Sequence, residues 1–211
     1  MKQTGTAQKV VVSGVFIALA TVLSLVVIFK LPYGGSITLL SMLPVMILGY
    51  MYGIKWGILC GLVYGIVQAM LGASMSSAFA GLTGFNVVLM AILDYLVAFA
   101  VLGTAGMFKG KIKNDTVAFS LGAAVAGLLR LLAHFTSGFI LWGSYAEWFF
   151  GAENMNNEFG NYILSNFSGT SLAMLYSAIY NGSYIPEIII TVIGIVVIMN
   201  VKPLRKEITG K

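Results

Sequence analysis

Long apolar runs alternate with short polar or basic connections along most of this chain. A helix that crosses a bilayer needs about 20 predominantly apolar residues, whereas membrane strands are shorter and alternate in polarity. The pattern therefore predicts an all-α integral membrane protein, in which residues 1–211 form a single domain of six transmembrane helices. The expected spans are residues 10–29, 37–52, 56–71, 85–108, 117–142 and 171–199.

Local signals refine these spans. The first apolar run is longer than the core of a signal peptide, and no cleavage site of small residues follows it, so we expect it to remain as a membrane helix. Residues 114–116 (Asn-Asp-Thr) are candidate N-caps for the fifth span. The Asn-Gly pair at 181–182 and Pro186 predict a break within the sixth span. We expect the polar, aromatic loop 143–170 to form a lid or a segment that lies on the surface.

The composition agrees with a membrane protein and argues against several function classes. Only 9% of the residues are charged, whereas a soluble domain carries about 25%. The single cysteine, Cys60, and the single histidine, His134, exclude a disulfide framework and argue against a metal site. No phosphate-binding loop motif occurs, so uphill transport would draw its energy from an ion gradient or from another chain. We expect no cofactor and no nucleic-acid partner, since basic loops account for the net charge of +5.

The distribution of basic residues predicts how the chain sits in the bilayer. With six spans and both termini in the cytoplasm, 10 of the 12 basic residues fall on the cytoplasmic side. Lys30 alone lies outside, and Arg130 lies within a span. Because cytoplasmic loops of membrane proteins are enriched in Lys and Arg, we expect a multi-pass protein of the cell membrane in this orientation. We find no internal repeat of the kind that is common in secondary transporters.

Three ionisable residues, Asp94, Arg130 and His134, stand out within the expected spans. An Asp or Arg at the bilayer centre costs about 2.5–3.5 kcal/mol on insertion scales, and such residues usually face a functional interior. At 1.5 Å per residue, Asp94 lies roughly 13 Å and His134 roughly 12 Å below the outer end of its span, and Arg130 lies one turn deeper.

Aromatic and amide side chains converge at a similar or shallower depth. They are Tyr95, Trp142, Tyr145, Tyr176, Tyr180 and Asn181. A single carboxylate favours a cation, and aromatic rings favour a flat or cationic group through contacts of about 0.5–2 kcal/mol each. The Asn181 amide can pair with the edge of a heterocycle that has a donor and an acceptor. The residues therefore predict a small, cationic, aromatic ligand that arrives from outside.

Each of these residues also has a structural interpretation. Asp94 and Arg130 could neutralise each other as a buried pair, and His134 could form a hydrogen bond between helices. Trp142 and Tyr145 lie near a span end, where aromatic belt residues are common. Tyr95 faces about 100° away from Asp94 on a helix and could touch lipid. The functional interpretation thus depends on the convergence of several residues.

At these positions the chain resembles the thiamine-specific substrate-binding (S) components of energy-coupling-factor (ECF) transporters, which import vitamins. The matching segments are LPYGGSI (31–37), MLP (42–44), LDYLVAF (93–99), LRLLAH (129–134) with SG (137–138) and WGSY (142–145), and LYSAIYNGSY (175–184). The resemblance implies six spans and a thiamine pocket near the outer face. It assigns substrate contacts to Asp94, Tyr95, His134, Trp142, Tyr176 and Asn181. Tyr33, Tyr145 and Arg130 are further candidates for substrate contacts.

The resemblance also implies partner subunits. S components of this family work with a transmembrane coupling subunit and two ATPases, and they dock through small residues on the first span. Gly14 and Ala18 stand at that place here, and Ala20 extends the small patch. Small residues four positions apart let helices approach closely in lipid, although such spacing is frequent in any apolar helix.

Three alternatives remain open at this point. The chain could be an S component for another cationic or pyrimidine-containing vitamin precursor. It could be a small ion-coupled carrier, with Asp94, Arg130 and His134 as a proton relay. An intramembrane hydrolase is disfavoured, because we identify no second carboxylate for a dyad and no second histidine. The sequence favours a thiamine-binding subunit without catalytic activity, embedded in the lipid bilayer.

Overall fold

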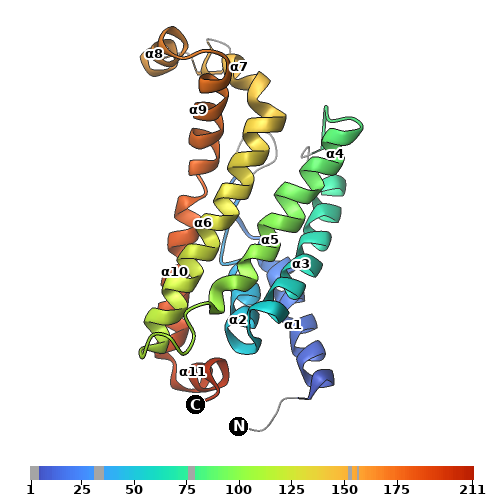
Figure 1. Ribbon diagram of the computed structural model, residues 1–211, viewed down its shortest axis with the longest axis vertical. Coiled ribbons are helices and arrows are strands. Elements are labelled where there is room, and N and C mark those ends of the chain that lie inside the picture. The colour runs from blue at the N-terminus through green and yellow to red at the C-terminus, as the bar shows by residue number, and fades with distance from the viewer. Residues whose placement is uncertain (1–4, 31–35, 76–78, 152–153, 156) are drawn as a thin grey trace.

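The computed structural model describes residues 5–30, 36–75, 79–151, 154–155 and 157–211 of the chain. It is an elongated bundle of helices, as Figure 1 shows. Five helical segments are long and apolar enough to cross a membrane, namely Thr6–Ser24, Ile54–Met75, Phe85–Gly106, Asp115–Phe150 and Gly169–Asn200. The prediction of an all-helical, multi-pass membrane protein is therefore confirmed, apart from one small hairpin.

The first expected span is shorter than the apolar run that predicted it. Helix α1 covers Thr6–Ser24, and the run continues as strand β1 (Val27–Lys30). This strand pairs in antiparallel register with β2 (Ser36–Thr38). The prediction of one helix over residues 10–29 is wrong, because the β-branched residues after Leu25 suit a strand and find a partner across the turn.

The second expected span also starts differently. Residues 36–38 belong to β2, and helix α2 covers only Leu43–Tyr52. Between them Leu40 has a φ of 60°, a left-handed conformation that is uncommon for a residue with a side chain. Pro44 lies in the first turn of α2, where its missing N–H costs no helical hydrogen bond. A helix of 10 residues reaches about 15 Å, half of a bilayer core.

Helix α2 lies inside the bundle rather than against lipid. Every residue from Leu43 to Tyr50 is buried. Its neighbours include α1, α3 (Ile54–Met75) and the 3-10 segment η3 (Val101–Gly106). Glycines permit the closest of these contacts: a Cβ on Gly57 would lie 2.5 Å from the Cα of Gly49 and 2.8 Å from the Cα of Gly103.

The fourth span is helical throughout but changes its winding. It consists of α4 (Phe85–Met90), a π-helical segment η2 (Ala91–Val97), α5 (Ala98–Ala100) and η3. A π-helix is rare, and it occurs frequently at functional sites. Asp94 and Tyr95 both belong to η2.

The fifth span, helix α6, is the longest element of the fold. It covers Asp115–Trp142, and Asn114 caps it as expected, since its Oδ1 accepts hydrogen bonds from the N–H groups of Thr116 and Val117. Figure 1 shows that α6 runs along most of the bundle, beside α9 (Gly169–Gly182) and α10 (Ile185–Asn200). The predicted break in the sixth span is confirmed, because α9 ends at Gly182 and α10 begins at Ile185.

Short helices close the two ends of the bundle. The loop after α6 contains η4 (Gly143–Tyr145), α7 (Ala146–Phe150) and α8 (Glu158–Asn166), and these lie at one end. At the other end, α11 (Lys202–Thr209) packs against α10 and α2. Lys211 Nζ donates to Asp115 Oδ2 over 2.7 Å, which fastens the C-terminal residue to the start of α6. The side of the membrane on which this end lies stays a prediction.

Candidate functional site

A cluster of polar side chains centres on the Asp94 carboxylate. The two residues that contact it, His134 and Ser137, belong to α6. His134 Nδ1 lies 2.7 Å from Asp94 Oδ1, and Ser137 Oγ donates a hydrogen bond to Asp94 Oδ2. Both oxygens of the carboxylate are thus held by one face of the neighbouring helix. The side chains of Asp94 and His134 are only 16% and 11% exposed, so the cluster is largely shielded.

Local geometry explains how these residues meet. Residues three and four positions apart lie on the same face of an α-helix, so Arg130, His134 and Ser137 form one polar row on α6. On the opposing span, the π-helical winding of η2 sets the direction of Asp94. The predicted convergence of Asp94 and His134 in space agrees with this arrangement.

Arg130 makes a different partnership from the one considered in the sequence. Its Nη1 lies 3.2 Å from Oε2 of Glu187, at the start of α10. The interpretation in which Asp94 and Arg130 neutralise each other is therefore wrong, since Asp94 is held by His134 and Ser137. The count of a single intramembrane carboxylate is also wrong. Glu187 directly follows Pro186, at the break of the sixth span, and an acid inside a predicted span is itself the signal that would have found it.

Glu187 also ties the hairpin to the helices. Its Oε1 accepts hydrogen bonds from Thr38 Oγ1 and, over 3.2 Å, from the backbone N–H of Thr38. Thr38 Oγ1 in turn lies 2.6 Å from Ser41 Oγ. Glu187 is only 1% exposed, and these bonds satisfy a carboxylate that would otherwise be costly to bury.

Tyr184 connects the two polar groups and was missed in the sequence. Its ring stacks on the His134 ring, with centroids 5.4 Å apart and planes 21° apart. The Arg130 guanidinium carbon lies 5.8 Å from the Tyr184 ring centroid and 4.9 Å from that of Phe99. Arg130 therefore makes cation–π contacts in addition to its ion pair. The position of Tyr184 next to the predicted break was the only local signal.

A small cavity adjoins this cluster. Its lining includes Arg130, His134, Tyr184 and Glu187. Its volume is about 10 Å³, which suffices for roughly one water molecule. Among the described residues, neither His134 Nε2 nor Arg130 Nε has a hydrogen-bond partner, although both atoms are buried. Buried polar groups are normally hydrogen-bonded, so these two atoms are ready to receive a water molecule or a ligand.

Tyr95 points to a different neighbour from Asp94. The Tyr95 ring stacks on the Phe79 ring, with centroids 5.5 Å apart. The Tyr95 hydroxyl lies close to α3, where a Cβ added to Gly72 would be 2.0 Å from it. The expected divergence of about 100° from Asp94 thus directs the ring against α3.

Trp142, Tyr145 and Tyr176, which are further predicted contacts, lie toward the loop that follows α6. Trp142 and Tyr145 have ring centroids 5.6 Å apart, at the junction of α6 and η4. Tyr176 on α9 is 5% exposed, and its ring packs against Phe149 of α7, with centroids 5.1 Å apart. These aromatic residues join the loop after α6 to α9. Phe149 is itself buried in this contact, so it is not a mobile lid residue in this structure.

Asn181 is fixed at the end of α9. It is 5% exposed, and its Nδ2 donates to the carbonyl oxygen of Ser177 over 3.0 Å. Gly138 lies opposite on α6, where a Cβ would be 2.8 Å from Asn181 Nδ2. The small residue lets the Asn181 amide lie directly against the helix that also holds His134.

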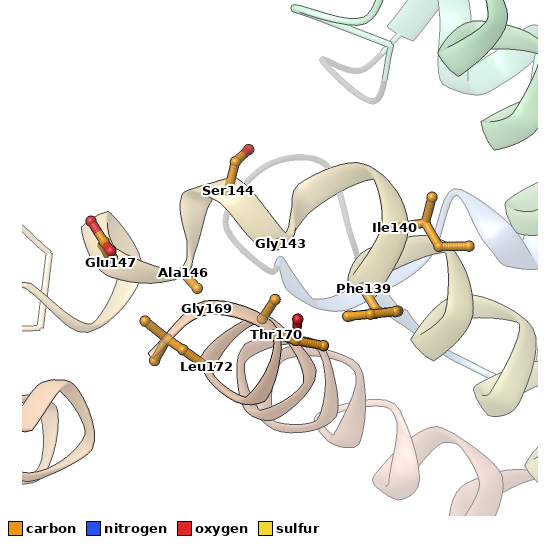
Figure 2. Close-up of a pocket in the computed structure, with 10 residues that line it drawn as sticks. Phe139, Ile140, Gly143, Ser144, Ala146, Glu147, Gly169, Thr170 and Leu172 are labelled. Carbon is orange, nitrogen blue, oxygen red and sulfur yellow. The ribbon is translucent and has the colours of Figure 1, made fainter. Parts of the chain in front are cut away.

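A second, larger hollow lies at the loop end of the bundle. It is a groove of about 390 Å³ between α6, α7 and the first turn of α9, and Figure 2 shows Glu147, Ser144 and Thr170 along it. Phe139 and Ile140 form its apolar part. Among the described residues, none of those predicted to bind the ligand lines this groove.

Some predicted residues lie elsewhere or outside the description. Tyr33 falls outside the described residues. Gly14 and Ala18 share an exposed face of α1, whereas Ala20 is fully buried, and its carbonyl oxygen accepts a hydrogen bond from Tyr64. Ala20 therefore does not extend an exposed patch of small residues.

The chemistry that these residues can perform is binding. Within the described part of the chain, no group of three or more His, Cys, Asp or Glu residues could hold a metal ion. Ser137 contacts Asp94, whereas a hydrolytic triad needs the histidine between serine and acid. The cluster instead offers a shielded carboxylate, a free imidazole nitrogen and nearby aromatic rings.

Comparisons with known proteins give a consistent result. Residues 10–151 match the model of a family described as "Thiamine transporter protein". The chain is 26% identical to the thiamine transporter ThiT of Bacillus subtilis (strain 168), over 96% of both chains. A solved structure of ThiT from Listeria monocytogenes has a TM-score of 0.68 at 20% identity, and the match covers 95% of this chain and 96% of the other. The chain therefore belongs to the thiamine transporter protein family, whose members are transport proteins and not enzymes.

Proposed function

We propose that this protein is the thiamine-binding S component of an ECF-type importer, which captures thiamine from the extracellular side. The observation that carries the proposal is the Asp94 carboxylate, which is held inside the bundle by His134 and Ser137. Among the described residues, its only basic ion partner is the histidine. Thiamine joins a permanently cationic thiazolium to an aminopyrimidine. A shielded carboxylate attracts the cation strongly, because the effective dielectric constant inside a protein is low.

The neighbouring side chains supply the other contacts in this proposal. His134 and Trp142 stack on the ligand rings, as the family resemblance implies. Asn181 pairs with the edge of the pyrimidine, and Tyr176 lines the same side of the pocket. Tyr95 contributes through its packing on α3 and reaches the ligand only with a change of side-chain rotamer.

Binding also requires the cluster to open. The cavity beside His134 has a volume of about 10 Å³, whereas sites for small organic ligands usually enclose about 300–1,000 Å³. In this proposal, Phe149 of α7 and Tyr176 of α9 move away from the cluster of Asp94 and His134 when thiamine enters. The break between α9 and α10 lies beside Asn181 and is the natural hinge for this movement.

The experiment compares thiamine binding by Asp94→Asn with the unchanged protein, using intrinsic tryptophan fluorescence or calorimetry in detergent. Asn retains the size of the side chain but removes its charge, so we expect the Kd to rise by at least about 30-fold, which corresponds to about 2 kcal/mol. Glu158→Gln, at an exposed position of α8, is the matched control and should leave the Kd unchanged. No response of the unchanged protein to micromolar thiamine would refute the proposal.

The transport part of the proposal assigns the energy to partner subunits. Binding of thiamine closes the outer side, and ATP hydrolysis by two ATPases, passed on by a transmembrane coupling subunit, drives release into the cytoplasm. Gly14 and Ala18 on the exposed face of α1 would make the contact with the coupling subunit. The absence of a phosphate-binding loop motif in this sequence supports an external energy source.

A further inference from the structure

The Arg130–Glu187 ion pair raises the question of why a transporter keeps two charges inside the membrane next to its binding cluster. Burying an ion pair often gives no net stability compared with apolar residues of the same size. Glu187 is 1% exposed and Arg130 is 11% exposed, so both charges are withdrawn from water. Such a costly pair calls for a functional explanation.

The pair is physically continuous with the Asp94 cluster. Arg130 and His134 lie one turn apart on α6, and both line the cavity of about 10 Å³ together with Glu187. Tyr184 contacts both residues: its ring centroid lies 5.4 Å from the centroid of the His134 ring and 5.8 Å from the guanidinium carbon of Arg130. The guanidinium charge therefore acts directly on a ligand that is bound at His134 and Asp94.

The charges of the cluster add up to a definite sign. Apart from His134, the formal charges are −1 on Asp94, +1 on Arg130 and −1 on Glu187, which sum to −1. Without Glu187 this sum would be zero, and the uncompensated charge of Arg130 would oppose the attraction between Asp94 and a cationic ligand. At roughly 10 Å and an effective dielectric constant of about 20, one unit charge changes a binding constant on the order of tenfold.

We infer that Glu187 is a specificity-determining residue, which neutralises Arg130 and thereby selects a cationic ligand over its anionic phosphate ester. This inference rests on the proposed thiamine site. Glu187 acts through Arg130 and is not expected to touch the ligand. Its bonds to Thr38 hold the carboxylate in place for this purpose.

The test measures the Kd of thiamine and of thiamine monophosphate at one fixed pH. The readout is the ratio of the two Kd values, because a general loss of packing lowers both affinities and leaves the ratio unchanged. Glu187→Gln retains an oxygen that accepts from Thr38, removes the charge and replaces the oxygen that faces Arg130 with an amide NH2 group. We expect it to lower the preference for thiamine by on the order of tenfold.

Arg130→Gln is the opposite variant and must act in the opposite direction. It leaves Glu187 as an additional negative charge, so the preference for thiamine over its monophosphate should rise. The double variant Arg130→Gln/Glu187→Gln restores the net charge of −1 and should return the ratio to that of the unchanged protein. Glu187→Asp keeps the charge and should also keep the ratio.

Each result then decides the inference. Opposite shifts in the two single variants support it. An unchanged ratio in both, or a shift of both in the same direction, overturns it. If Glu187→Gln does not fold, Arg130→Gln alone still decides, since a ratio that stays constant or falls contradicts the inference. Failure of the proposed function is distinguishable, because the unchanged protein would then bind neither compound.

Discussion

At the scale of single residues, the polar groups inside the membrane carry most of the information. Asp94, Arg130 and His134 were identified from the sequence because ionisable residues are rare in apolar spans. Their pairing was not predictable, since each could reach several partners across the bundle. The structure assigns Asp94 to His134 and Ser137, and Arg130 to Glu187.

The hydrogen bond from Ser137 to Asp94 makes a prediction at this scale. Ser137→Ala leaves one carboxylate oxygen without its donor in a largely buried site, so we expect the free energy of unfolding to fall by about 1–3 kcal/mol. Thermal unfolding in detergent would measure the effect. Thr136→Ala is the matched control, because the Thr136 hydroxyl is exposed and bonds only to the Leu132 carbonyl of its own helix. Equal losses in the two variants would contradict the prediction.

At the scale of elements, the sequence predicted the winding and the ends of the helices only in part. The N-cap at Asn114 and the break after Gly182 follow from local side chains and were predicted correctly. The π-helical segment Ala91–Val97 was not, because its winding depends on the neighbouring helices. The hairpin of β1 and β2 was also not predicted. An apolar, β-branched run suits both a helix in lipid and a paired strand, so the pattern alone does not distinguish the two.

The contact between α2, α3 and η3 gives a prediction at the element scale. Gly57→Ala would place a Cβ against backbone atoms of Gly49 and Gly103, which cannot move aside as a flexible side chain can. We expect it to lower the free energy of unfolding by about 1–3 kcal/mol or more. Gly14→Ala, on α1, is the control, because no atom lies within 4 Å of its added Cβ. If Gly57→Ala had the same melting temperature as the control, α2, α3 and η3 would be less closely packed than the structure indicates.

At the scale of the whole molecule, the bundle separates a polar interior from surfaces that remain free. The charged cluster lies between α6, α10 and the fourth span, while α1 exposes Gly14 and Ala18 on its outer face. We therefore expect that the proposed substrate site and the proposed docking face can be changed independently. Which end of the bundle faces the cytoplasm is still a prediction, made from the positions of the basic residues.

The independence of the two surfaces is testable with Ala18→Leu. A larger side chain blocks close approach of another helix, so we expect loss of assembly with the coupling subunit and loss of thiamine uptake in cells. The Kd for thiamine in detergent should stay within about twofold of the unchanged protein, since surface substitutions usually have small effects. Ala73→Leu, at an exposed alanine of α3, controls for the added bulk and should still allow uptake. Normal uptake by Ala18→Leu would exclude this face as the docking site.

The sequence alone determined the lipid environment, the helical class and several polar residues of the candidate site, because burial in lipid imposes long apolar runs and makes an intramembrane charge conspicuous. It also showed which spans would carry Asp94, His134 and Asn181. Only the tertiary structure decided that the second apolar run forms a short internal helix, that Tyr95 turns toward α3 and that Glu187 neutralises Arg130. These features depend on contacts between segments far apart in the chain, which local hydrophobicity does not encode.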